Sequence, residues 1–259
     1  MSGAILLTGA TGFLGMETLA RLLEDGGEEV VAVVRASDDA GARERLGNVL
    51  ASLYDEPPPA ASRVRAVRGD LLQPSLGLSA HDRAEVVGSV DRIVHCAASI
   101  SFDLPLVQAR EINVEGVARV IELAREIAAA GRLRRLVHVS TAYVSGRHSG
   151  SFGEEDLDVG QEFRNTYERS KHEAERLLGE AADLPVAIAR PSIVVGHRAS
   201  GWTPAFNVIY WPMRAFERGL LQEVPARPDS IVDFIPVDYV TDGIVALLHD
   251  EGARGAYSL

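Results

Sequence analysis

The sequence contains little cysteine, little positive charge and no long apolar run, and each shortage excludes a class of protein. Cys96 is the one cysteine, so neither an internal disulfide nor a cysteine-rich metal site can form. The seven histidines show no ligand spacing, and we expect no metal site. No apolar run approaches the roughly 20 residues of a membrane-spanning helix, and no signal sequence precedes the first expected strand. We therefore expect a cytoplasmic protein without a transmembrane span.

Acidic residues outnumber basic ones. The 259 residues carry 26 Lys and Arg against 37 Asp and Glu, and the resulting net charge of −11 argues against a nucleic-acid partner. The hydrophobic fraction of 46% is enough for a sizeable core, and the length suits one α/β domain over residues 1–259. No pattern favours one oligomeric state over another.

A glycine-rich turn near the start of the chain organises the rest. An apolar run over residues 4–7 leads into three glycines at the spacing G-x-x-G-x-x-G, and apolar residues then recur at helical period over 16–23. Strand, turn and helix in this order are typical of a dinucleotide-binding α/β fold, in which glycines let the main chain approach a pyrophosphate. We expect the cofactor to contact Gly9, Thr11, Gly12, Phe13, Leu14 and Gly15.

The end of the second expected strand bears on the choice of cofactor. The apolar run over residues 29–34 ends in Arg35, where this fold meets the adenosine ribose. An arginine suits a 2′-phosphate, whereas an acidic residue suits a free 2′-hydroxyl. Arg35 therefore predicts NADP(H) rather than NAD(H), and Arg45 is the choice for a second cation, with Arg43 as the alternative.

The next strand ends extend the expected cofactor site. A third strand over 63–69 leads to Asp70, which could accept from the adenine amino group or cap a turn, and to Leu71, which could pack on the ring. A fourth strand over 92–98 closes on the small residues Ala97 and Ala98, which leave room for the cofactor. Cys96 lies inside this strand without an activating base, and we interpret it as a buried structural thiol.

Two further segments are expected along the cofactor. Asn113 falls in a long helix expected over 108–130, where it could hold a water or a backbone carbonyl close to the active site, or lie on a polar face. After a sixth strand over 185–189, Pro191 and Ile193 are placed to pass along the nicotinamide. Residues 48–61, with three consecutive prolines, are expected to form a surface loop.

The chemistry is expected from a hydroxyl residue and a tyrosine–lysine pair. A fifth strand over 134–140 closes in Ser140 and Thr141, at the edge where open α/β sheets bind ligands. In a helix over 165–179, the i, i+4 spacing puts Tyr167 and Lys171 on one face. A free phenol has a pKa near 10, and a nearby ammonium lowers it, so the tyrosine can donate a proton to a carbonyl oxygen.

Residues 196–259 are expected to form a small carboxyl-terminal portion with most of the substrate-side elements. The stretch over 201–221 is rich in aromatic residues, which serve either as core or as a cover for an apolar substrate. These residues are Trp202, Phe206, Tyr210, Trp211 and Phe216.

Four features together resemble the extended short-chain dehydrogenase/reductase superfamily: the glycine fingerprint from Thr8, Asp70-Leu71, the hydroxyl strand end, and Tyr167 with Lys171. Within it the chain looks most like the fatty acyl-CoA reductase and thioester reductase branch, on the segments 34–36, 95–99, 139–143 and 233–240. The resemblance implies a Rossmann-type doubly wound parallel sheet. It also implies a catalytic triad of Thr141, Tyr167 and Lys171, with Ser140 as the competitor of Thr141.

The implied reaction is hydride transfer from NADPH to an acyl thioester, carried on coenzyme A or on a carrier protein, to give an aldehyde or an alcohol. Thioester reductases of this branch usually continue past the point where this chain stops, so either the chain is a domain of a larger protein or the assignment to this branch is too narrow. The alternatives are an epimerase, dehydratase or ketone reductase for a sugar nucleotide or small carbonyl, and a non-catalytic NADP(H)-sensing protein. A sensor would not need Tyr167 and Lys171.

Overall fold

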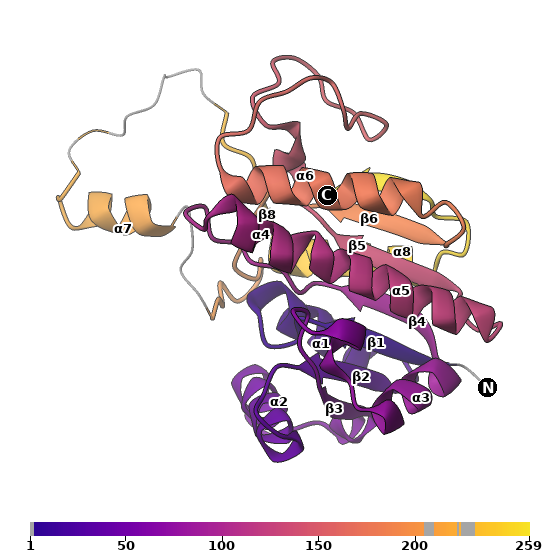
Figure 1. Ribbon diagram of the computed structural model, residues 1–259. Helices are drawn as coiled ribbons and strands as arrows, with labels where there is room; N and C mark the ends of the chain where they lie inside the picture. The colour runs from indigo at the N-terminus through magenta and orange to yellow at the C-terminus, as the bar shows by residue number, and fades with distance from the viewer. Residues whose placement is uncertain (1–2, 205–209, 222, 224–230) are drawn as a thin grey trace.

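A seven-stranded parallel sheet forms the centre of the computed structural model, which describes all residues except 1–2, 205–209, 222 and 224–230 (Figure 1). The strand order β3-β2-β1-β4-β5-β6-β9 reverses direction between β1 and β4, as in a doubly wound Rossmann fold. The predicted fold class is therefore confirmed. The strands are β1 (Ala4–Thr8), β2 (Val30–Val34), β3 (Val64–Arg68), β4 (Val90–His95), β5 (Arg135–Val139), β6 (Val186–Arg190) and β9 (Gly255–Ser258).

The central strands are buried on both faces, and their sequences explain why. β1 and β2 read AILLT and VVAVV, and every residue of both is buried. A continuous apolar run of this kind suits a parallel sheet that is covered by helices on both sides. Parallel strands also end at the same edge, so the residues that follow β1, β2, β4, β5 and β6 are brought together there.

Helices cover the two faces (Figure 1). One face packs against α1 (Phe13–Asp25), α2 (Asp39–Leu53) and α8 (Val237–His249), and the other packs against α3 (Ala80–Ser89), α5 (Glu115–Ala129) and α6 (Thr166–Glu180). The short helix α4 (Leu106–Asn113) leads into α5 and contacts α6. Turns of 3-10 helix lie at Pro59–Arg63, Pro74–Gly77 and Ala142–Ser145.

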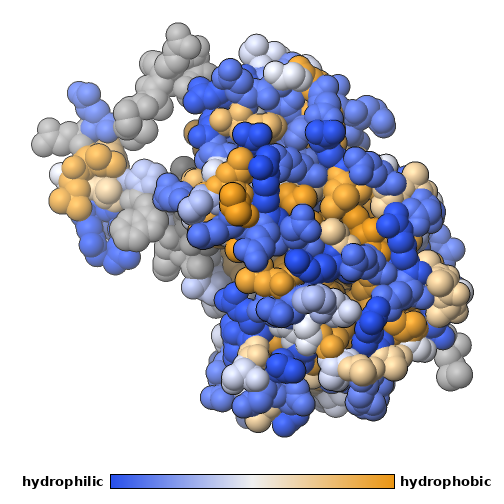
Figure 2. All heavy atoms as spheres, viewed as in Figure 1, coloured by the Kyte–Doolittle hydropathy of each residue, from blue (hydrophilic) through white to orange (hydrophobic). Residues whose placement is uncertain are grey.

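A second, small sheet pairs β7 (Ile193–Val195) with β8 (Phe234–Pro236), and α7 (Tyr210–Glu217) lies between them in sequence. Figure 2 shows apolar side chains on α7, where Met213 and Phe216 are exposed. The aromatic residues expected here do not share one environment. Trp202 packs against the core, whereas Phe216 is exposed. Phe206 lies outside the described residues.

Two expected elements differ from the structure. The loop expected over 48–61 begins later, because α2 continues to Leu53. Its residues Ala42, Leu46 and Val49 are buried at helical spacing, and the Asp38 side chain caps its start. The long helix expected over 108–130 is divided into α4 and α5 at Val114. Within the described parts of the chain, no helix has both the length and the apolar character needed to cross a membrane.

Candidate functional site

Two adjoining cavities lie at the carboxyl edge of the sheet. One, of about 280 Å³, lies beside the ends of β1, β2 and β3, and the other, of about 420 Å³, extends past the ends of β4, β5 and β6. Gly9, Gly12, Cys96 and Ala98 line both, so the cavities meet at the glycine turn. This is the edge at which open α/β sheets bind their ligands.

The glycine turn has the geometry of a phosphate-binding cradle. Gly9 has a φ of 79°, and the Gly12 N–H donates to its carbonyl at 2.9 Å. A Cβ on Gly15 would lie 2.0 Å from the Gly9 oxygen, whereas a Cβ on Gly12 would meet only that oxygen, at 3.4 Å. Gly15 is therefore needed for packing of α1 against the turn, and Gly12 keeps the cradle open. No side chain caps the start of α1, so its first N–H groups are left for an anion.

The first cavity contains the residues predicted to meet the adenosine half of the cofactor. Thr11, Arg35, Arg45, Asp70, Leu71 and Ala97 all line it. The Arg45 guanidinium donates to the carbonyl of Arg35 and so fixes the strand end from which the Arg35 side chain projects. Asp70 Oδ1 accepts from the Leu72 N–H at 3.0 Å, so this carboxylate caps a turn while it also borders the cavity.

The second cavity brings together the residues with chemical function. Thr141, Tyr167 and Lys171 line it, together with Ser140 and with Phe13, Leu14, Gly15, Pro191 and Ile193. The hydroxyl residues follow β5, and the other two side chains come from the first turns of α6. Helix α6 begins at Thr166 because the Asn165 side chain accepts from the Glu168 N–H at 2.8 Å. That cap fixes the place of Tyr167 in the first turn.

Tyr167 is a neutral phenol in this environment. Burial raises its pKa to about 12, and a side-chain hydrogen bond with Thr141 acts in the opposite direction. The net shift is thus upward, and the lowering of the Tyr167 pKa by Lys171 stays a prediction. Thr141 is 4% exposed, and its hydroxyl accepts from the Tyr143 N–H at 3.2 Å. The Ser140 hydroxyl has no hydrogen-bond partner among the described residues.

Lys171 is almost completely buried, at 2% exposure, and is held from the sheet. Its Nζ donates to the Val139 carbonyl at 2.7 Å and lies 3.0 Å from His138 Nε2. Burial lowers the pKa of Lys171 to about 8, and the carboxylate of Glu175, one turn further along α6, opposes that shift. Since an ammonium has three N–H donors, one is left for a group in the cavity.

Asn113 is the one predicted site residue that lines neither cavity. Its Oδ1 accepts from the Ser99 N–H at 2.8 Å, and its Nδ2 donates to the Ser99 carbonyl at 3.0 Å and to Ser170 Oγ at 2.9 Å. With its donors and acceptor engaged inside the protein, it joins the segment after β4 to α6. Its expected contact with a backbone carbonyl is present, and any contact with a cofactor stays a prediction.

Sequence reasoning missed several residues of the second cavity. Ile100, Phe102 and Tyr143 line it, and so does Ser192, whose buried hydroxyl has no partner among the described residues. The exposed Ile100 and Phe102 follow β4 in a segment without periodicity, so no pattern marked them. Cys96 was expected to be buried inside the fourth strand, but β4 ends at His95, and Cys96 follows it, half-buried and on the border of both cavities. Desolvation raises the pKa of its thiol to about 12, which disfavours the reactive thiolate.

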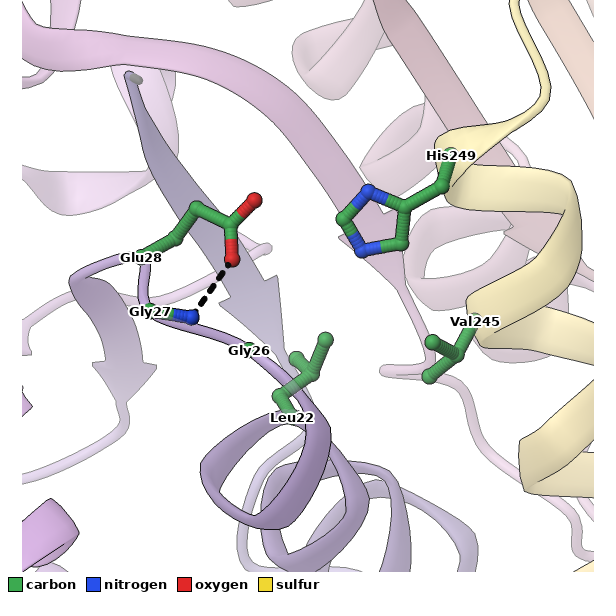
Figure 3. A pocket seen from close by; sticks show the side chains of 6 residues that line it. All are labelled: Leu22, Gly26, Gly27, Glu28, Val245 and His249. Carbon is green, nitrogen blue, oxygen red and sulfur yellow. Dashed lines mark hydrogen bonds between the residues drawn. The ribbon is translucent and has the colours of Figure 1, made fainter. Parts of the chain in front are cut away.

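A third hollow, of about 360 Å³, lies at the opposite end of the sheet (Figure 3). His249 at the end of α8 faces the turn before β2, where the Glu28 carboxylate accepts from the Gly27 N–H at 3.1 Å. Its lining includes none of the predicted site residues. The candidate functional site is therefore the pair of cavities at the carboxyl edge.

Comparisons with known proteins agree on one family. The model of the family described as male sterility protein, an NAD-binding domain, matches residues 7–244. Fatty acyl-CoA reductase 1 of Mus musculus is 32% identical over 278 residues, an alignment that covers 93% of this chain and 53% of that protein. The chain thus spans about half the length of the curated relatives it matches.

Solved structures give the same result. The terminal R domain from the myxalamid PKS-NRPS biosynthetic pathway superposes with a TM-score of 0.84 at 31% identity, over all of this chain and 66% of that one. The reductase domain of a non-ribosomal peptide synthetase from Mycobacterium tuberculosis superposes with a TM-score of 0.78 at 26% identity, over all of this chain and 67% of that one.

Proposed function

The chain belongs to the male sterility protein family of NAD-binding domains, and from that membership we propose that it is an NADPH-dependent reductase of acyl thioesters. The observation that carries the proposal is the second cavity. It joins the glycine cradle to Thr141, Tyr167 and Lys171 in one space of about 420 Å³. A hydroxyl donor, a half-buried phenol and an ammonium around one space are groups that can protonate and stabilise the oxygen of a carbonyl that is being reduced.

The residues of this chain fit a nicotinamide dinucleotide. A Cβ on Gly9 would come within 2.6 Å of the Ala97 nitrogen, so glycine lets β1 and β4 end close together at the turn. A Cβ on Gly12 would meet only the Gly9 oxygen, at 3.4 Å, so the space beside Gly12 is open to the cofactor backbone. When bound, the nicotinamide supplies the hydride for the reaction. Gly9, Gly12 and the start of α1 would hold the pyrophosphate, while Pro191 and Ile193 would border the nicotinamide end.

Proton transfer is assigned to Tyr167. Its neutral phenol would donate to the carbonyl oxygen of the substrate as negative charge develops there, and Thr141 would donate a second hydrogen bond to the same oxygen. The remaining N–H of Lys171 would stabilise the phenolate left on Tyr167. A neutral phenol with a pKa raised to about 12 is a weak acid, so this stabilisation decides whether the proton moves.

Two features support an acyl thioester as the substrate. The mouth of the second cavity carries exposed apolar side chains, Ile100 at 60% and Phe102 at 40%, which suit an acyl chain. The relatives are named as fatty acyl-CoA reductases and as reductase domains of peptide synthetases. Arg35 beside the first cavity supports NADPH over NADH, because a guanidinium can bind a 2′-phosphate through two hydrogen bonds.

A sugar nucleotide or a small carbonyl is the alternative substrate, and a non-catalytic sensor of NADP(H) is the alternative of another class. Solved structures with a similar fold include a UDP-N-acetylglucosamine 4-epimerase from Methanobrevibacter ruminantium, with a TM-score of 0.70 at 18% identity. That likeness concerns the fold alone. A phenol and an ammonium that line the same cavity argue against a pure sensor, which would not need either group.

The test follows oxidation of NADPH by absorbance, with NADH as the control, across short and long acyl-CoA thioesters, and identifies the product. Aldehyde or alcohol formed with NADPH supports the proposal. Arg35→Ala should then raise the KM for NADPH much more than that for NADH. No turnover of any thioester, together with turnover of a sugar nucleotide or small ketone, would replace the proposed substrate class.

A further inference from the structure

A row of polar side chains crosses the sheet directly beneath Lys171. The register pairs Thr8 of β1 with His95 of β4, and His95 with His138 of β5. Residues paired in this way point to the same face of a sheet. Each of the three is at most 2% exposed, and Thr8 also borders the first cavity. Histidines buried side by side in a sheet are costly and require an explanation.

Each member of the row contacts the next. Thr8 Oγ1 lies 2.7 Å from His95 Nδ1, and the ring centroids of His95 and His138 are 5.2 Å apart. The row ends where His138 Nε2 meets Lys171 Nζ at 3.0 Å. Strand β5 therefore supplies two acceptors to one ammonium, the imidazole of His138 and the carbonyl of Val139.

The imidazole of His138 makes no second hydrogen bond within the described part of the chain. Its Nδ1 is buried and has no hydrogen-bond partner there. An apolar side chain would fill the same space without leaving a buried polar atom unpaired. The bond to Lys171 is thus the feature that accounts for a histidine at this position.

We propose that His138 is a positioning residue, whose neutral imidazole accepts a hydrogen bond from the Lys171 ammonium. Together with the Val139 carbonyl, it aims the remaining N–H of Lys171 into the cavity. What the Lys171 N–H does in the cavity rests on the proposed function. The hydrogen bond between His138 and Lys171 does not depend on that function. His138 can accept only while it is neutral, and burial together with the charge of Lys171 keeps its pKa well below the usual value.

The charges around Lys171 are few. The groups that face it are Tyr167 and Glu175 on its own helix, Cys96 after β4, and the two histidines of the row. Burial lowers the pKa of His95 to about 3, so it is neutral like His138. Glu175 is the one carboxylate among these groups, and it is paired with Arg190. Removal of the His138 acceptor should therefore change the pKa of Lys171, because no other group can replace the lost hydrogen bond.

Lys171 is the one lysine of the sequence, since the other Lys and Arg positions are all arginines. A protein grown with lysine labelled at Cε with ¹³C therefore gives one side-chain signal. Its chemical shift followed against pH reports the titration of Lys171 in the full chain, with no substrate and no turnover. The titration is measured for the wild type, His138→Leu, His138→Gln and His95→Leu.

We expect His138→Leu to lower the titration midpoint of Lys171 by about 1 to 2 pH units, because a hydrogen bond to the charged form is lost. His138→Gln, whose amide oxygen can replace Nε2 as the acceptor, should return the midpoint toward the wild-type value. His95→Leu removes an equally buried histidine that does not contact Lys171, and it should move the midpoint by much less. Thermal unfolding and NADPH binding establish that each variant is folded, and His138→Met replaces His138→Leu if the latter does not fold.

An unchanged midpoint in His138→Leu or His138→Met overturns the proposal. So does a drop in His138→Gln as large as in the apolar variant, or an equal drop in His95→Leu, because either result would trace the shift to general packing. The activity readout is separate. Where turnover is found, the alkaline limb of the kcat/KM profile should move with the midpoint. A wild type that reduces no thioester counts against the proposed function only, since the titration still decides the role of His138.

Discussion

Glu175 and Arg190 form a buried ion pair between α6 and the end of β6, with Oε2 and Nη2 2.7 Å apart. Their side chains are 1% and 4% exposed. The same guanidinium donates to the carbonyls of Gly153, Glu154 and Asp156, and so attaches the loop before α6 to the sheet. One pair therefore connects the helix that carries the candidate catalytic residues, the end of β6 beside the second cavity, and the loop that precedes α6.

Glu175→Gln should destabilise the protein severely. The change leaves the Arg190 guanidinium buried without its counter-charge, which costs about 3 to 5 kcal/mol of unfolding free energy. Urea unfolding measures the difference. The matched control is Asp183→Asn, which breaks the pair of Asp183 with Arg125 on the surface, where both side chains are about half exposed, and should change stability little. Equal stability of the two variants would contradict a central role for the buried pair.

Gly12→Ala and Gly15→Ala should separate cofactor binding from folding. A Cβ on Gly12 meets only the Gly9 oxygen at 3.4 Å, and Gly12 has a φ of −92° that alanine adopts readily. We therefore expect Gly12→Ala to fold with near wild-type stability and to lose NADPH affinity at least tenfold, because the methyl group enters the cradle. Thermal unfolding and a fluorescence titration with NADPH measure the two quantities.

Gly15→Ala should instead lower stability as well, because its Cβ would lie 2.0 Å from the Gly9 oxygen and the helix would have to shift. The two variants add the same methyl group three residues apart, so each is the control for the other. Unimpaired NADPH binding by Gly12→Ala would show that the pyrophosphate does not lie over this turn.

The sequence predicts the fold and most of the cavity lining because both depend on local patterns. Apolar runs that end in small or hydroxyl residues predicted the strand ends, and the structure brings those ends to one edge. The resemblance to the extended short-chain dehydrogenase/reductase superfamily is confirmed by the family match and by the solved reductase domains. The roles of the individual site residues stay predictions, since they depend on chemistry that no comparison tests.

Contacts between distant segments could not be predicted. The pairing of Lys171 with His138 depends on the position of α6 over β5, which no local pattern encodes. Asn113 was expected near the cofactor, but its side chain is engaged by Ser99 and Ser170. The division between α4 and α5 escaped prediction for a similar reason, because apolar residues continue at helical spacing on both sides of Val114.

Of residues 196–259, α8 and β9 belong to the central layers, while the predicted substrate-side role of this segment stays a prediction.

Variants of the two adjacent hydroxyl residues should identify the one that acts on the substrate. Thr141 and Tyr167 line the same cavity, and the Thr141 hydroxyl would contact the same carbonyl oxygen as the phenol. We expect Thr141→Val to lower kcat roughly 10²- to 10³-fold, by analogy with the loss of one donor to a developing oxyanion. Ser140→Ala removes the neighbouring hydroxyl and should have a smaller effect.

Tyr167→Phe provides the reference for complete loss of the proton donor, with NADPH binding nearly intact. Steady-state kinetics and cofactor binding are measured for all three variants. A larger loss in Ser140→Ala than in Thr141→Val would transfer the role to Ser140, whose buried hydroxyl lies on the same cavity.

Lys171 should make the stability of the protein depend on pH in the alkaline range. Its pKa is lowered from 10.5 to about 8 in the folded state, chiefly by burial. Between these two values the unfolded chain binds more protons than the folded one, so stability increases as the pH rises through this window and is lost again as the pH falls toward 8.

Relative to Lys171→Met, which lacks the titrating group, the unfolding free energy of the wild type should rise by about 2 to 3 kcal/mol from pH 7.5 to pH 10. Urea unfolding of both proteins at several pH values measures this difference, in which the other titrating groups largely cancel. A difference that stays constant over the window would mean that Lys171 keeps an ordinary pKa, and the ammonium would then be present at all physiological pH values without help from its surroundings.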